Sequence, residues 1–276
     1  MHSPIISRPR QRAQLPMTLS ACALLAGCAS FSTDGGFGAV AQTTQQRLGP
    51  AVSVEWARTP QQAEALQARA ATLLAAPLSA DAAVQVALLN NRELQAAFFE
   101  LGIAEADLVQ SGRLPNPGFT FSALTRGDER EIERGIHFNL ARLIAMPLAQ
   151  RIERARFEQT QSDAAAQVLS LAADTRKAWI NAVAADETVR YMRQVQSAAD
   201  ASAELARRMA AVGNWNALQQ AREQGFSADA ALNVARAQRA LAAARERLTR
   251  LMGLWGEQTA FTLPERLPDL PAGAQE

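Results

Sequence analysis

The longest helix-compatible stretch of this sequence runs from Pro147 to Val212, about 66 residues that contain no glycine and no proline after the first position. Small and apolar residues recur along it at heptad spacing, in two neighbouring rows. The rows are Val168, Thr175, Ala182 and Val189, and Leu171, Ala178, Ala185, Met192 and Ala199. An unbroken helix of this length would reach roughly 100 Å. The chain has 276 residues and cannot bury such a rod in its own core, so the rod needs neighbouring helices from this chain or its copies.

Charge and composition exclude several classes of protein. The formal net charge is +1 and no basic domain stands out, which argues against nucleic acid as the main partner. Hydrophobic residues make up 48% of the chain but aromatic residues only 5%, so the apolar share is mostly Ala, Leu and Val, which suits close helix packing. No apolar run is long enough for a membrane-spanning helix, which needs about 18 or more residues.

The first 27 residues have the features of a secretory signal peptide. Three arginines precede a short, mainly apolar region from Leu15 to Gly27. This region ends in Leu25-Ala26-Gly27-Cys28, which resembles the lipobox of bacterial lipoproteins. The resemblance implies that Cys28 becomes the lipidated first residue and, because Ala29 is not acidic, that the protein moves to the outer membrane. A chance cysteine, or cleavage by the ordinary signal peptidase, remains the alternative.

Two segments flank the region predicted to be ordered. Residues 28–77 are predicted to form a lipid-linked tether and an N-terminal segment, because residues 29–50 are rich in Gly, Ser, Thr and Gln. A helix is expected within it from Pro60 to Ala76. Residues 257–276 contain three prolines and are predicted to be an extended linker tail.

Helical periodicity covers most of residues 78–256. One helix is predicted over 79–112, with Ser79 as its N-cap and a heptad row that contains Leu94 and Leu101. Two further helices are predicted over 147–212 and 215–252, joined by a tight turn at Gly213. The expected fold class is therefore mainly α, a long coiled-coil hairpin of helices with one β-hairpin inserted.

The β-hairpin is predicted from alternation in residues 118–126 and 131–142. Each strand has the length of a tilted transmembrane strand, about nine to eleven residues. In a membrane, one set of side chains would face lipid and the other would face water, and other hairpins would have to pair the strand edges. The lipid-facing candidates are Phe119, Phe121, Ile136, Phe138 and Leu140, and the pore-lining candidates are Thr120, Ser122, His137 and Asn139. The arginines and glutamates of residues 126–134 indicate a solvated outer loop, and a soluble hairpin packed on helices is the alternative for the whole motif.

The sequence offers no constellation for catalysis. It has no Ser/His/Asp set and no phosphate-binding loop, and His137 is the one histidine beyond the signal segment. Cys22 would be removed with the signal and Cys28 would carry lipid, which leaves no thiol for redox chemistry or metal binding. We therefore expect no enzyme activity, no catalytic residue, no cofactor and no metal site.

Three segments together resemble one repeat of the TolC-type outer-membrane efflux proteins. Residues 78–117, with "ALLNN" and the exit "LPNP", resemble the first helix of that repeat. "RRMAAVGNWNALQQAREQ" from Arg207 resembles its periplasmic helix–turn–helix, and "RERLTRLMGL" from Arg245 resembles its end. The resemblance covers residues 78–256 and implies one half of the outer-membrane efflux duct fold.

The resemblance also implies a function and partners. Family members are passive ducts for small molecules or metal ions, and a periplasmic adaptor and an inner-membrane pump supply docking and energy. The tip formed by Val212, Gly213, Asn214 and Trp215 would contact the adaptor, although an ordinary turn between helices would have the same residues. Full-length members assemble as homotrimers and sit in outer-membrane lipid. The exported substrate, whether metal, drug or organic solute, stays open.

The main departure from the family is the number of repeats. Full-length members carry two repeats, whereas this chain has one and supplies two strands where they supply four. Either the product is truncated, or more subunits assemble. The tail resembles a linker into a second repeat, which favours truncation. The alternative functions are a periplasmic coiled-coil lipoprotein with a structural or interaction role, and a non-functional truncated fragment.

Overall fold

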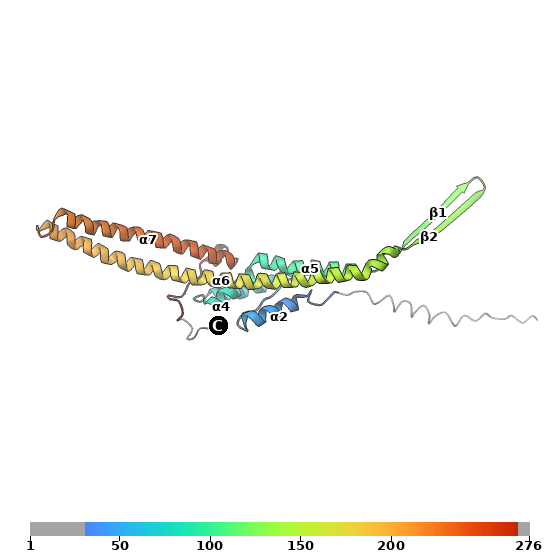
Figure 1. The fold of residues 1–276 in the computed structure, drawn as a ribbon, viewed down its shortest axis with the longest axis horizontal. Coiled ribbons are helices and arrows are strands. Elements are labelled where there is room, and N and C mark those ends of the chain that lie inside the picture. The colour runs from blue at the N-terminus through green and yellow to red at the C-terminus, as the bar shows by residue number, and fades with distance from the viewer. Residues whose placement is uncertain (1–30, 270–276) are drawn as a thin grey trace, which may run out of the picture. The chain divides into compact units, whose positions relative to one another are not determined.

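The computed structural model describes residues 31–269, so the predicted signal peptide (1–27) and the lipidation candidate Cys28 lie outside the described residues. The fold is mainly helical with a two-stranded antiparallel hairpin, as the sequence predicts (Figure 1). The elements in chain order are α2 (Phe37–Leu48), α3 (Pro60–Leu74), α4 (Ala80–Asn90), α5 (Arg92–Ser111), β1 (Gly118–Arg126), β2 (Glu129–His137), α6 (Leu140–Ala211), α7 (Ala217–Leu251) and the 3-10 helix η1 (Gly256–Thr259).

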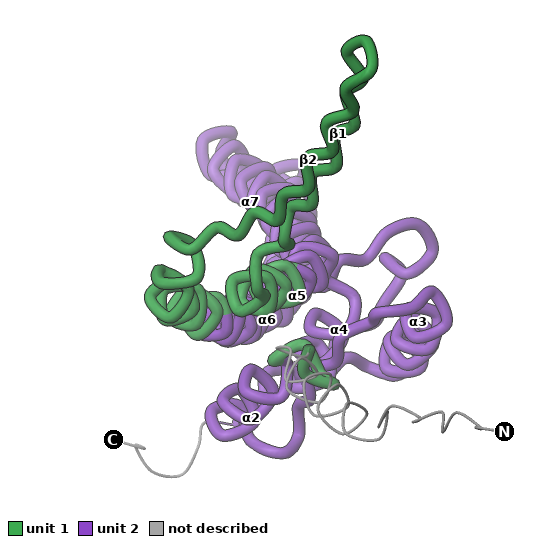
Figure 2. The backbone as a smooth tube through the Cα atoms, turned by 90° about the vertical axis from the view of Figure 1, so that its right-hand side faces the viewer, with its two compact units in different colours: residues 1–36, 100–160 green, residues 37–99, 161–276 purple. Residues whose placement is uncertain are grey.

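The chain divides into two compact units (Figure 2). The first comprises residues 1–36 and 100–160 and holds the β-hairpin. The second comprises residues 37–99 and 161–276 and holds α2, α3, α4, α7 and most of α6.

The core of the second unit is built from small side chains of α6 and larger ones from α4 and the end of α7. Every member of the first predicted heptad row is buried: Val168, Thr175, Ala182 and Val189. Trp179 anchors the cluster, because its indole Nε1 donates a hydrogen bond of 2.7 Å to the carbonyl oxygen of Leu78. A buried tryptophan needs such a partner for its one polar group.

The long helix α6 and helix α7 lie side by side and are joined by a turn that closes with two backbone hydrogen bonds (Figure 1). Asn214 N–H donates to Met209 O at 2.9 Å and Gly213 N–H donates to Ala210 O at 3.1 Å, the pattern of a Schellman C-cap. Gly213 has a φ of +77°, which a residue without Cβ adopts at least cost. Asn216 then caps α7 in a capping box with Gln219.

The helix predicted over 79–112 is divided at Asn91, which the prediction missed. Asn91 has an extended ψ of 117°, and its side chain accepts a hydrogen bond from Leu94 N–H at 3.0 Å as it begins α5. Its amide also donates to Leu251 O at 3.1 Å, and the Asn90 amide donates to Gly253 O at 2.8 Å. The break is therefore stabilised by the carbonyls at the end of α7, a distant partner that local periodicity does not reveal.

The second strand ends earlier and the long helix begins earlier than predicted. Strand β2 ends at His137 instead of residue 142, and α6 begins at Leu140 instead of Pro147. Asn139 explains the change, because its side chain accepts a hydrogen bond from Arg142 N–H at 2.9 Å and caps the helix. Pro147 lies inside α6, where we had expected the helix to begin. The predicted strand residues Asn139 and Leu140 thus belong to a helix start.

The expectation of a flexible tether over residues 29–50 is wrong for residues 37–48. These residues form α2, in which Val40 and Thr44 are buried. Phe37 meets the ring of Phe98 edge-on at 5.0 Å between centroids. The polar composition suggested a tether, but the few apolar residues of this segment pack within the second unit.

An extended segment after α2 is held by two glutamine side chains of α4 and α5. Gln85 accepts from Ser53 N–H at 2.8 Å and donates to Ser53 O at 3.0 Å. Gln95 accepts a hydrogen bond from Ala57 N–H at 3.0 Å and donates one to Glu55 O at 2.9 Å. Each amide satisfies both backbone groups that a neighbouring strand would otherwise pair.

The tail predicted as an extended linker packs against the second unit over its described part. Phe261 is 3% exposed and belongs to the core, with the Arg245 guanidinium 4.5 Å from its ring centre. Leu78 N–H donates to Thr262 O at 2.9 Å, and Leu267 N–H donates to the Glu187 carboxylate at 2.6 Å. Apolar residues between the prolines explain the packing, which the proline count obscured.

Replacement of Gly253 by alanine tests the junction between α4 and α7. A Cβ at Gly253 would lie 2.8 Å from Asn90 O, and the residue has a φ of +64°. The strained backbone alone costs about 1–3 kcal/mol. We expect Gly253→Ala to lower the free energy of unfolding by at least this amount, measured by urea denaturation followed by circular dichroism.

Gly225→Ala is the matched control in the same helix, because nothing lies within 4 Å of a Cβ there. It should leave stability unchanged or raise it by up to about 1 kcal/mol. Equal unfolding midpoints for the two variants would contradict the proposed junction.

Two tryptophan-to-phenylalanine variants test the buried hydrogen bond in the core. Trp179→Phe leaves the buried carbonyl of Leu78 without its partner, which costs about 1–3 kcal/mol. Trp56→Phe removes an indole N–H that is buried but has no hydrogen-bond partner. We expect thermal unfolding to show the larger loss for Trp179→Phe, and the reverse order would refute this account of the core.

Candidate functional site

The β-hairpin of the first unit presents two chemically different faces. Its strands have nine residues each and are joined by the two-residue turn Gly127-Asp128. Phe119 lies opposite Ile136, and Thr120 lies opposite Gly135, so the register places the predicted apolar and polar sets on different faces. Every residue of the two strands is exposed except Ser122 and Gly135, which are half-buried.

The apolar face carries large side chains in contact with solvent. Phe119 is 70% exposed, Ile136 is 66% exposed and Phe121 is 57% exposed. Contiguous apolar exposure of this kind marks a surface that something else covers. Phe138 and Leu140, which the sequence had placed in the same set, lie beyond the end of β2 and are not part of the strand face.

The polar face is organised around Thr120 and His137. The Thr120 hydroxyl and His137 Nε2 are 2.8 Å apart. Gly135 leaves room for this contact, because a Cβ there would meet His137 Nε2 at 3.2 Å. Ser122 lies on the same face, but Asn139 does not, since it caps α6. The strands thus hold three of the four predicted pore-lining residues.

Arg126 and the charged residues from Glu129 to Arg134 all belong to strands, although the sequence suggested a solvated outer loop there. Of these, Glu129 and Arg130 lay outside the predicted strands. Glu129, Glu131 and Glu133 pair with Arg126, Leu124 and Ser122 and so lie on the polar face. Arg130 and Arg134 pair with Thr125 and Phe121 and lie on the apolar face. Charge density suggested a loop, whereas the two-residue turn extends the ladder through it. The alternation of Arg130, Ile132, Arg134 and Ile136 was the signal that could have shown this.

The turn between α6 and α7 presents the predicted docking residues at its surface. Val212 is 71% exposed, whereas Trp215 is half-buried beside it. About two helical turns earlier, Glu204 forms a hydrogen bond of 2.7 Å with Arg208 and another with Arg207. The Arg208 contact, followed by that of Arg207, holds the pKa of the Glu204 carboxyl below its usual value.

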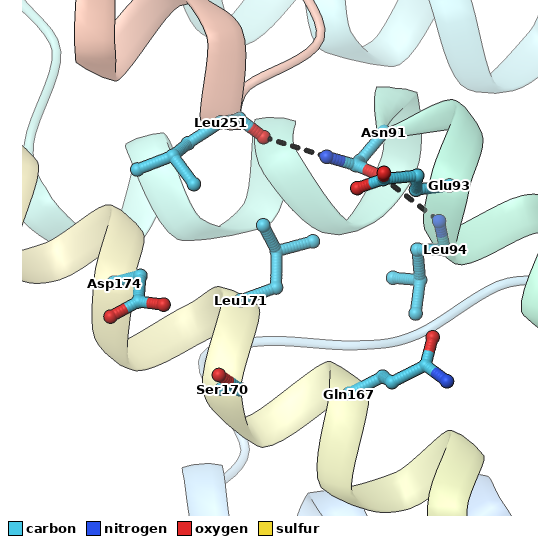
Figure 3. A pocket seen from close by; sticks show the side chains of 8 residues that line it. All are labelled: Asn91, Glu93, Leu94, Gln167, Ser170, Leu171, Asp174 and Leu251. Carbon is cyan, nitrogen blue, oxygen red and sulfur yellow. Dashed lines mark hydrogen bonds between the residues drawn. The ribbon is translucent and has the colours of Figure 1, made fainter.

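A cleft of about 230 Å³ lies beside the break between α4 and α5 (Figure 3). Figure 3 shows the Asn91 amide on the Leu251 carbonyl, with Leu171 and Leu94 facing the space between the helices. Its acidic side chains are Glu93 and Asp174. Sequence analysis did not single out this cleft, because the residues that line it come from three distant segments.

Within residues 31–269, no helix combines the length and apolar character needed to cross a membrane. No cluster of three or more His, Cys, Asp or Glu side chains there could hold a metal ion.

Comparisons with known proteins identify the fold. No protein-family model matches the chain, and no curated protein matches it significantly. Among solved structures, CusC matches with a TM-score of 0.56 and 20% identity over 71% of this chain. The CusC structures concern the conformational changes that accompany folding and transmembrane channel formation. The Campylobacter jejuni CmeC outer membrane channel matches with a TM-score of 0.58 and 19% identity over 69% of this chain. A Pseudomonas aeruginosa membrane protein matches with a TM-score of 0.55 and 19% identity over 64% of this chain.

The chain spans about half the length of these structures, 49% of CusC and 44% of each of the other two. At this identity the likeness establishes the fold alone. This chain has the fold of one half of the outer-membrane efflux duct.

Proposed function

We propose that this chain is an outer-membrane channel subunit of a tripartite efflux system, a passive export duct for small molecules or metal ions. The observation that carries the proposal is the two-faced, largely exposed hairpin that is followed in the chain by a 72-residue helix, in the fold of channel proteins. The pump selects the substrate in this scheme, because a passive duct wall discriminates weakly.

The two faces of the hairpin suit a boundary between lipid and water. Phe119, Phe121 and Ile136 would meet hydrocarbon, and Thr120, Ser122 and His137 would line the aqueous side. The three glutamates of β2 would add negative charge to the aqueous side. Within residues 31–269, each strand has one edge without a strand partner, and lipid cannot satisfy such backbone groups. Hairpins of further subunits would complete the wall, so the proposal includes a homo-oligomer.

The remaining parts have roles consistent with this arrangement. The proposal includes a lipid anchor at Cys28 in the outer membrane, with the helices in the periplasm. The exposed tip at Val212 and Gly213 would dock a periplasmic adaptor, which connects to an inner-membrane pump. Neither an enzymatic step nor a cofactor nor nucleic acid enters this mechanism.

A periplasmic coiled-coil lipoprotein with a structural role is the competing function, and a truncated fragment without function is the third. A soluble structural protein would pack the apolar face of the hairpin against helices. The described hairpin has Phe119 at 70% and Ile136 at 66% exposure, which favours the channel.

Cysteine labelling of two adjacent positions separates the channel from the competing lipoprotein. Phe121→Cys and Ser122→Cys are introduced separately into a chain in which Cys22 is replaced by serine. In intact outer membranes, a membrane-impermeant maleimide should label Ser122→Cys, because that side chain faces water. Phe121→Cys should react only after detergent extraction, because lipid covers it.

Ser122→Cys serves as the matched control, since it shares strand, depth and reagent with Phe121→Cys. Equal labelling of the two positions in intact membranes would mean that water reaches both faces, and it would exclude the channel in favour of a soluble hairpin.

A further inference from the structure

Two arginines interrupt the apolar face of the hairpin, and this face is the lipid-facing one if the proposed channel function is correct. Arg134 lies opposite Phe121, and Arg130 lies opposite Thr125, with Ile132 between them on the same face. Two arginines at this spacing on a strand are about 13 Å apart along its axis. This face is thus purely apolar near its base, the end of the strands farthest from the turn. Toward the turn, arginine and isoleucine alternate along β2.

The nearby carboxylates cannot neutralise these arginines. Glu129, Glu131 and Glu133 are their direct neighbours in sequence, but strand alternation points them to the opposite face. Neither Arg130 nor Arg134 forms an ion pair or a hydrogen bond through its guanidinium with the described part of the chain. Further copies do not help, because hairpins that close one symmetric sheet all present the same face outward.

Depth in a membrane restricts what these arginines can meet. An arginine on the lipid face is costly at the bilayer centre and nearly free of cost at the interface. The base of the face, with Phe119, Phe121 and Ile136, suits hydrocarbon, so only the end near the turn, with Arg130, lies at the level of the lipid headgroups. Arg134 lies at the depth of Phe121, and its long side chain would extend toward the turn to bring the guanidinium to the headgroups. A guanidinium there matches a phosphate diester in charge and in bidentate geometry.

We propose that Arg130 and Arg134 form a binding surface for the phosphate groups of anionic lipids, which fixes the depth of the hairpin in the membrane. The surface lies on the outer side of the channel wall and takes no part in the export path. Ile132, between the two arginines, and Ile136 keep the same face in contact with the upper part of the acyl chains.

Vesicle binding by the full chain tests this surface. The partition coefficient is measured by flotation with vesicles of phosphatidylcholine and with vesicles of equal parts phosphatidylcholine and phosphatidylglycerol. We expect the natural chain to have a higher partition coefficient on the anionic vesicles than on the neutral ones. In R130Q/R134Q the ratio of the two coefficients should fall roughly fivefold for each arginine, about 25-fold in total. Retention of the full preference by R130Q/R134Q would overturn the proposal.

Two further variants separate local recognition from net charge and from misfolding. E131Q/E133Q changes two charges on the opposite face and should leave the preference within about twofold. A change as large as that of R130Q/R134Q would show that net charge alone decides binding, which refutes a localised surface. R130K/R134K keeps both charges but not the bidentate geometry, so its preference should fall between those of the natural chain and R130Q/R134Q. A far-ultraviolet circular dichroism spectrum of R130Q/R134Q that matches the natural chain shows that the glutamine variant did not act through unfolding.

Free inorganic phosphate distinguishes a lipid headgroup from a soluble anion. Millimolar phosphate at constant ionic strength should not release the chain from anionic vesicles, whereas release would assign the arginines to soluble phosphate and overturn the lipid assignment. Labelling of Phe121→Cys in the same vesicles keeps the two proposals apart. If maleimide labels Phe121→Cys, the proposed channel function is wrong. If Phe121→Cys is protected but the chain shows no preference for anionic vesicles, only the proposed headgroup-binding surface is wrong.

Discussion

The unsatisfied edges and faces of a two-stranded hairpin are the constraint on which this structure depends. Both strands have nine residues, both faces are exposed, and each strand has an edge without a strand partner among the described residues. Such a hairpin is marginal in water and prohibited in lipid unless other strands complete it. Over residues 31–269, the apolar face is exposed, the edge backbone groups are unpaired by strands, and the two arginines have no carboxylate partner on their face. In the proposed membrane assembly, lipid chains would cover the face, further subunits would pair the edges, and lipid phosphates would bind the arginines.

The helical core of the second unit is closely packed. Small residues along α6 allow close packing, and Trp179, Phe261 and Met252 fill the core that the alanines leave. The carboxyl end of α7 is held by Asn90 and Asn91, and Gly253 permits the close approach of the two backbones. This junction ties the start of α5 to the end of α7, so sequence-distant segments stabilise each other.

Sequence reasoning found the elements whose causes are local and missed those whose causes are distant. Heptad spacing predicted the long helix and its buried row from Val168 to Val189, and Gly213 marked the turn to α7. The break at Asn91 escaped prediction because its partners lie about 160 residues away, as the Asn91–Leu251 and Asn90–Gly253 bonds show. Asn139 was assigned to a strand, although its short polar side chain suits an N-cap equally well.

The hairpin shows how far the site itself was predictable. Alternation placed Thr120, Ser122 and His137 on one face and Phe119, Phe121 and Ile136 on the other, as observed. The charged residues of 126–134 were interpreted as a loop because so many charges lie close together in the sequence. The alternation of arginine and isoleucine from Arg130 to Ile136 was given less importance. Their segregation depends on the register set by the two-residue turn, which the sequence could not fix among neighbouring alternatives.

Amide hydrogen exchange of the hairpin in outer membranes tests the central claim, that other hairpins complete its edges in lipid. The exchange of β1 and β2 is compared between native membranes and the chain released from them by detergent. We predict slow exchange along both strands in the membrane, because edge amides are then paired, and fast exchange of the edge amides after release. Fast exchange of the edge amides in the membrane itself would contradict the channel and leave a hairpin that no partner completes.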